Sequence, residues 1–229
     1  MVTTSPAPVD SARTLRDKLE ELEERSRAHA LAVAIHDQET GQQFRYRSDR
    51  WFHAASTIKL AVLLGVFASF HQGRFVPQSR LHVRNRFRSA YDGSSFRVRS
   101  ERDADSEVQA AIGKTMRLVE LARHMIVRSS NLATNLLLDL LGIEFLQTVL
   151  DNYGLTGIDL RRGVEDELAF DHQINNRVTA DGLVQLLRLI AEERAFTPEL
   201  SHHMLAILHD QEFRSGIPAG LPAHARVAH

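Results

Sequence analysis

Residues 56–70 read Ser-Thr-Ile-Lys-Leu-Ala-Val-Leu-Leu-Gly-Val-Phe-Ala-Ser-Phe and include the longest wholly apolar run of the chain, Leu60 to Ala68. A helix through this stretch is apolar nearly all round, which predicts that it is buried at the centre of a layer of the fold. We expect Ser56 or Thr57 to cap its N-terminus, and the sequence His-Gln-Gly at 71–73 to end it.

The chain before this helix predicts a surface helix and a β-hairpin. Leucines at positions 15, 19 and 22 recur among charged residues, which is typical of an amphipathic helix from Ser11 to about Arg27. Side chains then alternate in character over residues 31–35 and again over 43–47, with a turn at 38–41 between the two runs.

The chain after the central helix predicts helices almost to its end. We expect residues 74–114 to be irregular and rich in arginine, followed by helices over about 116–128, 132–141 and 143–153. Thr179 then caps a leucine-rich helix, and Thr197-Pro198 starts the last one, with proline where its missing N–H costs nothing. A single hairpin is a marginal sheet with two open edges, so we expect the sheet to be incomplete.

The length of 229 residues predicts one domain or two closely joined ones. We expect a loose tail over residues 1–10 and an α/β part over 11–69 that holds the first helix, the hairpin and the central helix. A helical part over 70–213 and a turn-rich linker over 214–229 complete the expected organisation.

The composition excludes several classes of function. Lys+Arg 28 against Asp+Glu 29 gives a net charge of -1, so no global field favours nucleic acid or membranes. The absence of cysteine excludes disulfides, thiolate catalysis and cysteine-ligated zinc or iron–sulfur sites. The only lysines are Lys18, Lys59 and Lys114, and lysine, unlike arginine, can lose its proton near neutral pH.

No apolar run approaches the roughly 20 residues that a membrane helix needs. The first residues have neither the basic start nor the apolar stretch of an export signal. We therefore expect no membrane partner and a cytoplasmic location for the chain as written, or a periplasmic or secreted one if a signal has been removed.

Ser56 and Lys59 place a hydroxyl and an amine three residues apart at a helix start, on one face and within reach of each other. Serine is a poor nucleophile unless a base takes its proton, and a lysine desolvated among Leu and Val can be that base. The alternative is structural: Ser56 caps the helix and Lys59 reaches water along its apolar stem.

Ser129-Ser130-Asn131 lies between two predicted helices, where Ser and Asn are also favoured as N-caps. Together with Ser56 and Lys59, these residues resemble the S-x-x-K and S-D-N elements of the class A β-lactamase superfamily of serine hydrolases. Glu165-Asp166-Glu167-Leu168 is similar to the family's acidic loop motif E-x-x-L-N. The segments 175–181 and 213–218 fit the same ordered pattern.

The resemblance implies an α/β fold of the serine β-lactamase and transpeptidase type, with a helical subdomain packed on an antiparallel sheet. Ser56 would attack a carbonyl to form an acyl-enzyme, with Lys59 as base or proton relay. Ser129 would pass the proton to the leaving nitrogen, Asn131 would bind the substrate's amide, and Glu165 would activate the deacylating water. No metal or other cofactor is implied.

Three positions depart from the family pattern. Ser130 stands where the S-D-N element has Asp, which we expect to loosen a local network. Ala169 stands where E-x-x-L-N has Asn, which puts fast deacylation in doubt. No Lys-Thr-Gly or Lys-Ser-Gly string occurs, and in the family this element supplies the substrate-carboxylate contact and the second oxyanion donor.

We therefore expect residues 1–229 to be the N-terminal portion of this fold, with little turnover, since losing one oxyanion donor alone costs ~10²–10³ in rate. Three functions follow. The first is β-lactam hydrolysis, and the second is a penicillin-binding or esterase-type hydrolase with slow deacylation. The third is a non-catalytic fragment that needs a C-terminal piece. We expect that piece, or a second copy, to associate through the open sheet edge.

Two other features of the sequence could indicate a different function. The arginines between positions 80 and 99, with aromatic residues among them, could bind nucleic acid, but acidic residues follow directly and favour a solvated loop. His202, His203 and His209 could hold a metal, but no carboxylates stand at suitable spacing, which favours surface histidines.

Overall fold

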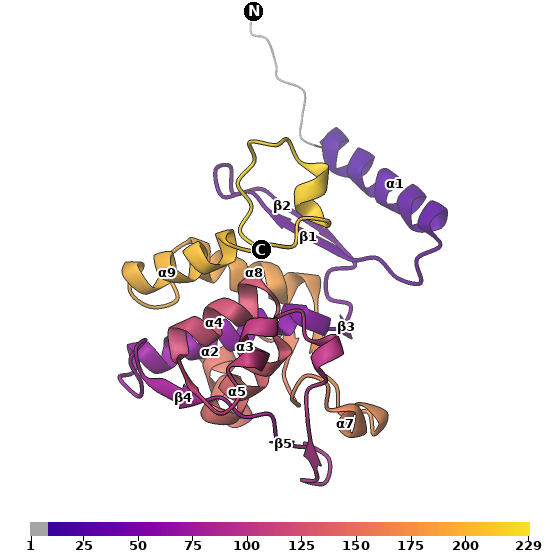
Figure 1. Ribbon diagram of the computed structural model, residues 1–229. Helices are drawn as coiled ribbons and strands as arrows, with labels where there is room; N and C mark the ends of the chain where they lie inside the picture. The colour runs from indigo at the N-terminus through magenta and orange to yellow at the C-terminus, as the bar shows by residue number, and fades with distance from the viewer. Residues whose placement is uncertain (1–8) are drawn as a thin grey trace, which may run out of the picture.

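The computed structural model describes residues 9–229, and their side chains from Arg13 onward. Residues 1–8 of the predicted tail lie outside the described residues, and residues 9–10 are already helical. The fold is a helical body with a hairpin and its flanking helices at one end (Figure 1).

The central helix starts differently from the prediction. A 3-10 turn, η1 (Ala55–Ile58), leads directly into α2 (Lys59–His71), and no side chain caps either element. The Thr57 hydroxyl donates instead to the Ala54 carbonyl at 2.5 Å. The predicted cap at Ser56 or Thr57 is therefore wrong, because the tight turn places both residues inside the first turn rather than before it.

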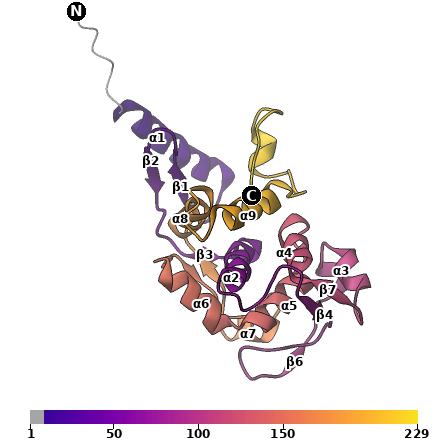
Figure 2. The same cartoon turned by 90° about the vertical axis from the view of Figure 1, so that its left-hand side faces the viewer.

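The helix α2 is buried, as its all-round apolar sequence predicts, with Val62, Leu63, Leu64 and Phe67 fully enclosed. Figure 2 shows it at the centre of the helical body, surrounded by other helices. The helices that contact it are α4 (Leu118–Val127), α5 (Asn131–Leu141), α6 (Ile143–Asn152) and α9 (Pro198–His209). Gly65 permits this packing, since a Cβ there would stand 1.9 Å from Leu146 Cδ2.

The predicted N-terminal helix and hairpin are confirmed. The helix α1 (Val9–Ser26) precedes β1 (Val33–His36) and β2 (Gln43–Tyr46), which pair antiparallel with Val33 opposite Tyr46. On one side the hairpin is tied to α1 by Tyr46 and Arg47, which both bond to Glu23. On its other side β1 contacts α8 (Ala180–Ala191), which joins the hairpin to the helical body (Figure 2).

The prediction of a single hairpin misses three further small antiparallel sheets. They are β3 (Phe52–His53) with β9 (Arg177–Val178) and β8 (Ile158–Asp159); β4 (Arg80–His82) with β7 (Thr115–Arg117); and β5 (Phe87–Arg88) with β6 (Ser95–Phe96). Each strand has two or three residues, too few to give a period-two pattern in the sequence. The helix predicted from residue 116 accordingly starts later, after β7.

The shorter elements complete the fold. They are η2 (Ser100–Arg102), α3 (Ser106–Ala110), α7 (Glu167–Asp171) and η3 (Ile217–Gly220). The predicted caps at the other helices are confirmed, since the hydroxyls of Thr179 and Thr197 accept from the N–H groups of Gly182 and Leu200.

The predicted class, a helical subdomain packed on small antiparallel sheets, is the observed one. The boundaries proposed for its subdomains stay a prediction. Within residues 9–229 no single helix is long and apolar enough to cross a membrane; α5 and α6 reach that length only as a pair bent by 83°.

Candidate functional site

Ser56, Lys59 and Ser129 form a closed triangle of polar atoms at the start of α2. Lys59 Nζ lies 3.3 Å from Ser56 Oγ and 2.8 Å from Ser129 Oγ, and the Ser129 hydroxyl donates to Ser56 Oγ at 3.1 Å. Ser56 is exposed, whereas Lys59 is only 2% exposed. The alternative in which Ser56 caps the helix and Lys59 reaches water is therefore excluded.

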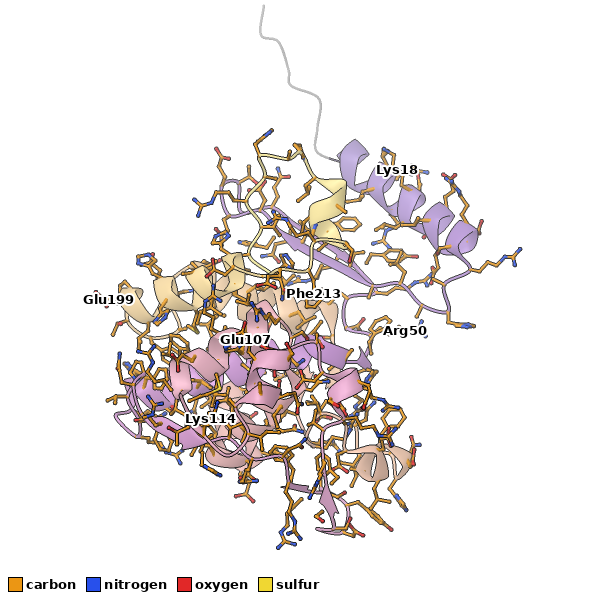
Figure 3. The ribbon with its side chains drawn as sticks, in the orientation of Figure 1. Lys18, Arg50, Glu107, Lys114, Glu199 and Phe213 are labelled. Atoms are coloured by element: carbon orange, nitrogen blue, oxygen red, sulfur yellow. The ribbon has the colours of Figure 1, made fainter. Side chains whose placement is uncertain are left out.

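The amine of Lys59 is desolvated but has acceptors in reach. Besides the two hydroxyls it meets the Ser129 carbonyl at 2.6 Å and Asn131 Oδ1 at 2.8 Å. Burial lowers the pKa of Lys59 from 10.5 to about 8, while the charges of Asp103 and Glu165 oppose this fall. The other two lysines are exposed and lie far from each other, Lys18 on α1 and Lys114 on the helical body (Figure 3).

The connection between α4 and α5 brings Ser129 to α2. Ser129 has a φ of 56°, a left-handed conformation that serine rarely adopts and that is concentrated at functional sites. The next residue, Ser130, caps α5 by accepting from the N–H of Ala133 at 3.1 Å. The capping alternative therefore holds for Ser130, while the hydroxyl of Ser129 contacts Lys59 and Ser56.

The network around Ser130 is not loosened by the missing Asp. The carboxylate of Asp103, which follows η2, accepts from the backbone N–H groups of Asn131 and Leu132, each at 3.0 Å. That expectation is corrected: the carboxylate comes from a distant part of the chain. The sequence singles out Asp103 only as one of several acidic residues after an arginine-rich stretch, so its role was missed.

Glu165 is connected to the triangle of Ser56, Lys59 and Ser129 through Asn131. Its Oε1 accepts from Asn131 Nδ2 at 2.7 Å, and its Oε2 accepts from the backbone N–H of Arg99 at 3.0 Å. Glu165 has a φ of 59°, the second strained backbone position of the site. Asn131 therefore links Lys59 to Glu165, and the structure brings all five predicted residues into one hydrogen-bonded chain.

Glu165, Asp166 and Glu167 form an acidic turn before and at the start of α7. Asp166, which is fully buried, anchors this acidic turn to the rest of the fold. Asp166 accepts from the Ser89 hydroxyl at 2.8 Å and the Ala90 N–H at 2.7 Å, and it caps α7 through the N–H of Ala169. Ala169 is itself fully buried. Asp166 therefore anchors the acidic turn, whereas Glu165 contacts Asn131 of the candidate site.

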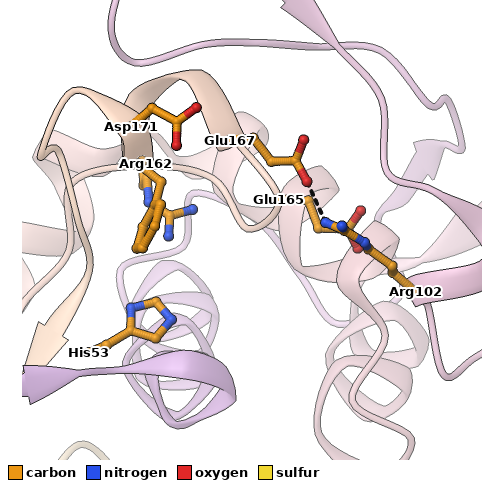
Figure 4. Close-up of a pocket in the computed structure, with 7 residues that line it drawn as sticks. His53, Arg102, Arg162, Glu165, Glu167 and Asp171 are labelled. Atoms are coloured by element: carbon orange, nitrogen blue, oxygen red, sulfur yellow. Dashed lines mark hydrogen bonds and ion pairs between the residues drawn. The ribbon is translucent and has the colours of Figure 1, made fainter.

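Two cavities meet this network. One of about 290 Å³ contains Ser56, Lys59 and Ser129 and is otherwise walled mainly by apolar side chains, among them Leu183 and Leu208. The other, of about 470 Å³, contains Glu165 and is polar (Figure 4). In it Arg102 pairs with Glu167, and Arg162 lies over the Phe170 ring. Ser56 lines the first cavity and Glu165 the second, and Asn131 connects the two groups through its bonds to Lys59 and Glu165.

The arginine-rich segment is used within the fold. Arg80 donates to Thr115 Oγ1 at 2.8 Å, Arg84 pairs with Asp139, and Arg99 pairs with Glu167 at 3.3 Å. The segment packs beside the acidic turn and supplies the N–H that holds Glu165.

Two of the three histidines of α9 have other contacts: His202 bonds to Glu193, and the ring of His203 packs edge-on against that of Phe67. In the part of the chain that the structure describes, no group of three or more His, Asp or Glu side chains could hold a metal ion.

A serine hydroxyl in contact with a desolvated amine, with a second hydroxyl between them, is the arrangement of a serine nucleophile activated by lysine. The fold and this site resemble those of the serine hydrolases that use a Ser–Lys pair. A family model described as the β-lactamase enzyme family matches residues 14–229. The chain therefore belongs to the β-lactamase enzyme family.

Known relatives agree with this assignment. β-lactamase ROB-1 of Haemophilus influenzae is 31% identical over 161 residues, which cover 67% of this chain and 48% of the relative. The chain thus spans about half the length of the curated relatives it matches. ROB-1 of Mannheimia haemolytica matches over the same extent.

Solved structures show the same fold. An ancestral class A β-lactamase superposes with a TM-score of 0.77 at 27% identity, over 92% of this chain and 76% of the other. A variant of PBP-A, in an acyl-enzyme complex with penicillin G, gives a TM-score of 0.78 at 24% identity, over 94% and 76%. At that identity the second likeness concerns the fold alone.

Proposed function

We propose that the chain carries the nucleophile of a serine hydrolase that opens β-lactams, or related esters and amides, through an acyl-enzyme on Ser56. The observation that carries this proposal is the contact of the exposed Ser56 hydroxyl with the buried Lys59 amine and the Ser129 hydroxyl. A buried amine without a functional use is costly, since desolvation penalises its charge.

Acylation starts with proton transfer from Ser56. With a pKa of about 8 for Lys59, about a tenth of the amine is neutral at pH 7, and its lone pair can accept the proton from Ser56 Oγ. Oγ then bonds to the carbonyl carbon, and the carbon–nitrogen bond breaks. The leaving nitrogen takes the Ser129 proton, which Lys59 replaces. The N–H of Ser56, in the first turn of η1, can polarise the carbonyl oxygen.

Deacylation falls to Glu165, which would take a proton from the attacking water. Asn131 and the Arg99 N–H already hold both of its oxygens, which orients the carboxylate. Each oxygen keeps a second lone pair for water. Ala169 offers no amide to share that water, so a second candidate is a penicillin-binding or esterase-type function in which the acyl-enzyme persists.

An intact-mass time course with penicillin G, beside Ser56→Ala, tests the proposal. We expect a mass increase equal to the whole penicillin in the parent chain and none in Ser56→Ala. An increase that decays supports hydrolysis, and one that persists supports the second candidate. No increase in the parent chain contradicts acylation by residues 1–229 alone. The same time course with added C-terminal sequence of a relative then tests the complementing partner expected at the hairpin edge.

A further inference from the structure

The carboxylate of Asp103 sits against the first turn of α5, the helix that begins directly after Ser129 and Ser130. Its Oδ1 accepts from the N–H of Asn131 and its Oδ2 from the N–H of Leu132, both at 3.0 Å. Gln109 Nε2 donates to the same Oδ2 at 3.0 Å, and the Ser130 hydroxyl lies 3.4 Å away. The carboxylate is therefore held from both sides.

These contacts complete the start of α5. The first N–H groups of a helix have no partner within it and need an acceptor from elsewhere. Asp103 takes those of Asn131 and Leu132, and Ser130 Oγ takes that of Ala133. A negative charge is also favourable at this end of the helix dipole. Ser130 alone would leave two donors unmatched.

The same segment also fixes the Asn131 side chain. The carbonyl of Arg102 accepts from Asn131 Nδ2 at 3.2 Å, beside the bond from that nitrogen to Glu165. Asn131 is thus held at its backbone by Asp103 and at its amide by Arg102. With the amide so oriented, its Oδ1 faces Lys59 Nζ at 2.8 Å.

We infer that Asp103 is a positioning residue for the proposed Ser56 chemistry, which fixes through the first turn of α5 where Ser129 and Asn131 stand around Lys59. The inference rests on the proposed function for its catalytic consequence. Asp103 touches none of the reacting groups itself. It supplies, from the loop after η2, the carboxylate that position 130 of this chain lacks.

The charge of Asp103 gives this role a signature that a purely structural cap would not have. The carboxylates of Asp103 and Glu165 both raise the pKa of Lys59, while burial lowers it by more. On α4, the titratable His124 pairs with Asp105 at 2.5 Å. Removing the Asp103 charge should therefore lower the pKa of Lys59 further.

The test uses four forms of the chain: the parent, Asp103→Asn, the double variant Asp103→Ala with Ser130→Asp, and the control Glu101→Gln. Glu101 is exposed and two residues away, so its variant removes the same charge outside the network. Lysine labelled with ¹³C at Cε gives three signals in this chain, and Lys59→Arg assigns the buried one. Amide hydrogen exchange reports on Asn131 and Leu132.

In Asp103→Asn we expect the Lys59 titration midpoint to move below its parent value of about 8 and the two amides to exchange faster. Acylation by penicillin G should slow by on the order of tenfold to hundredfold, the effect of misplacing catalytic groups. The pH dependence of the acylation rate should shift to lower pH together with the Lys59 midpoint. Glu101→Gln should match the parent. The double variant should recover part of the way toward it, because Asp at the N-cap restores a carboxylate at the start of α5 and can accept from the N–H of Leu132.

An unchanged midpoint and unchanged exchange in Asp103→Asn would overturn the inference. Faster exchange with a parent-like midpoint and parent-like acylation would reduce Asp103 to a helix cap, which also overturns it. If the parent chain does not acylate at all, the proposed function fails, while the midpoint and the exchange still decide whether Asp103 positions Asn131 and Lys59. If Asp103→Asn does not fold, a double variant that folds and recovers toward the parent in midpoint and exchange supports the inference, and one that folds but departs from the parent in both contradicts it.

Discussion

Asn131 Nδ2 donates a hydrogen bond of 2.7 Å to Glu165 Oε1, while the oxygen of the same amide accepts from Lys59. The two contacts fix the amide orientation, because only its nitrogen can donate and only its oxygen can accept. One side chain thereby joins the proposed acylating and deacylating groups.

Replacing Glu165 with Gln tests the second of those groups. We expect the acyl-enzyme to form within about tenfold of the parent rate but to decay ~10²–10⁴ times more slowly, the usual contribution of a general base. The measurement is the lifetime of the penicillin adduct by intact mass. Glu167→Gln is the matched control, since Glu167 is exposed and pairs with Arg102 rather than Asn131. Equal adduct lifetimes in parent and Glu165→Gln would remove Glu165 from deacylation.

Replacing Lys59 with Met tests the base. Methionine fills a similar volume in the apolar surroundings but cannot accept the Ser56 proton, so the acylation rate should fall by ~10²–10⁴. A chromogenic β-lactam gives the rate constant. The exposed Lys114→Met should acylate like the parent. Retention of the parent rate in Lys59→Met would assign the proton transfer to another group.

The stability of the fold should depend on pH through Lys59. Its folded pKa of about 8 lies below the ordinary value of 10.5, so between these pH values the unfolded state binds one more proton than the folded state. The free energy of unfolding should therefore rise with pH across this window, by about 3 kcal/mol in total, and be flat in this respect below it.

Urea unfolding of the parent chain and of Lys59→Met from pH 7 to 10.5 isolates this effect, because other titrating groups cancel in the difference. The parent should gain stability relative to Lys59→Met as pH rises. A constant difference would mean that Lys59 is solvated in the folded chain.

Gly182 sets how closely α8 approaches Gly157, the residue directly before β8. A Cβ at Gly182 would stand 2.4 Å from the Gly157 carbonyl oxygen and 2.7 Å from its Cα, and backbone atoms cannot move aside cheaply. Gly182→Ala should cost about 1–3 kcal/mol, or about 2–4 °C of Tm for each kcal/mol. Gly216→Ala is the control, since its Cβ would meet nothing within 4 Å. Equal melting temperatures would contradict the packing of α8.

Much of the fold could be predicted from the sequence. Local signals each predicted the element found. They are the long apolar run of α2, the leucine-rich face of α8, the caps at Thr179 and Thr197, and the alternation of side chains in the hairpin. The three-stranded sheet of β3, β9 and β8 was missed, because it joins two-residue strands far apart in the chain, and such strands have no period of their own.

The site divides in the same way. The spacing of Ser56 and Lys59 and the resemblance of Ser129, Asn131 and Glu165 to family motifs were enough to select the five residues. Sequence alone left open whether Lys59 reaches water, and it gave Asp103 no role. Both matters depend on which distant segments meet, since burial lowers the pKa of Lys59 and a carboxylate from the loop after η2 completes α5. Local sequence thus determined the helices and selected the residues of the proposed site, while tertiary packing decided how those side chains are protonated and oriented. The reason is that desolvation and hydrogen-bond partners belong to the folded environment rather than to any one stretch of chain.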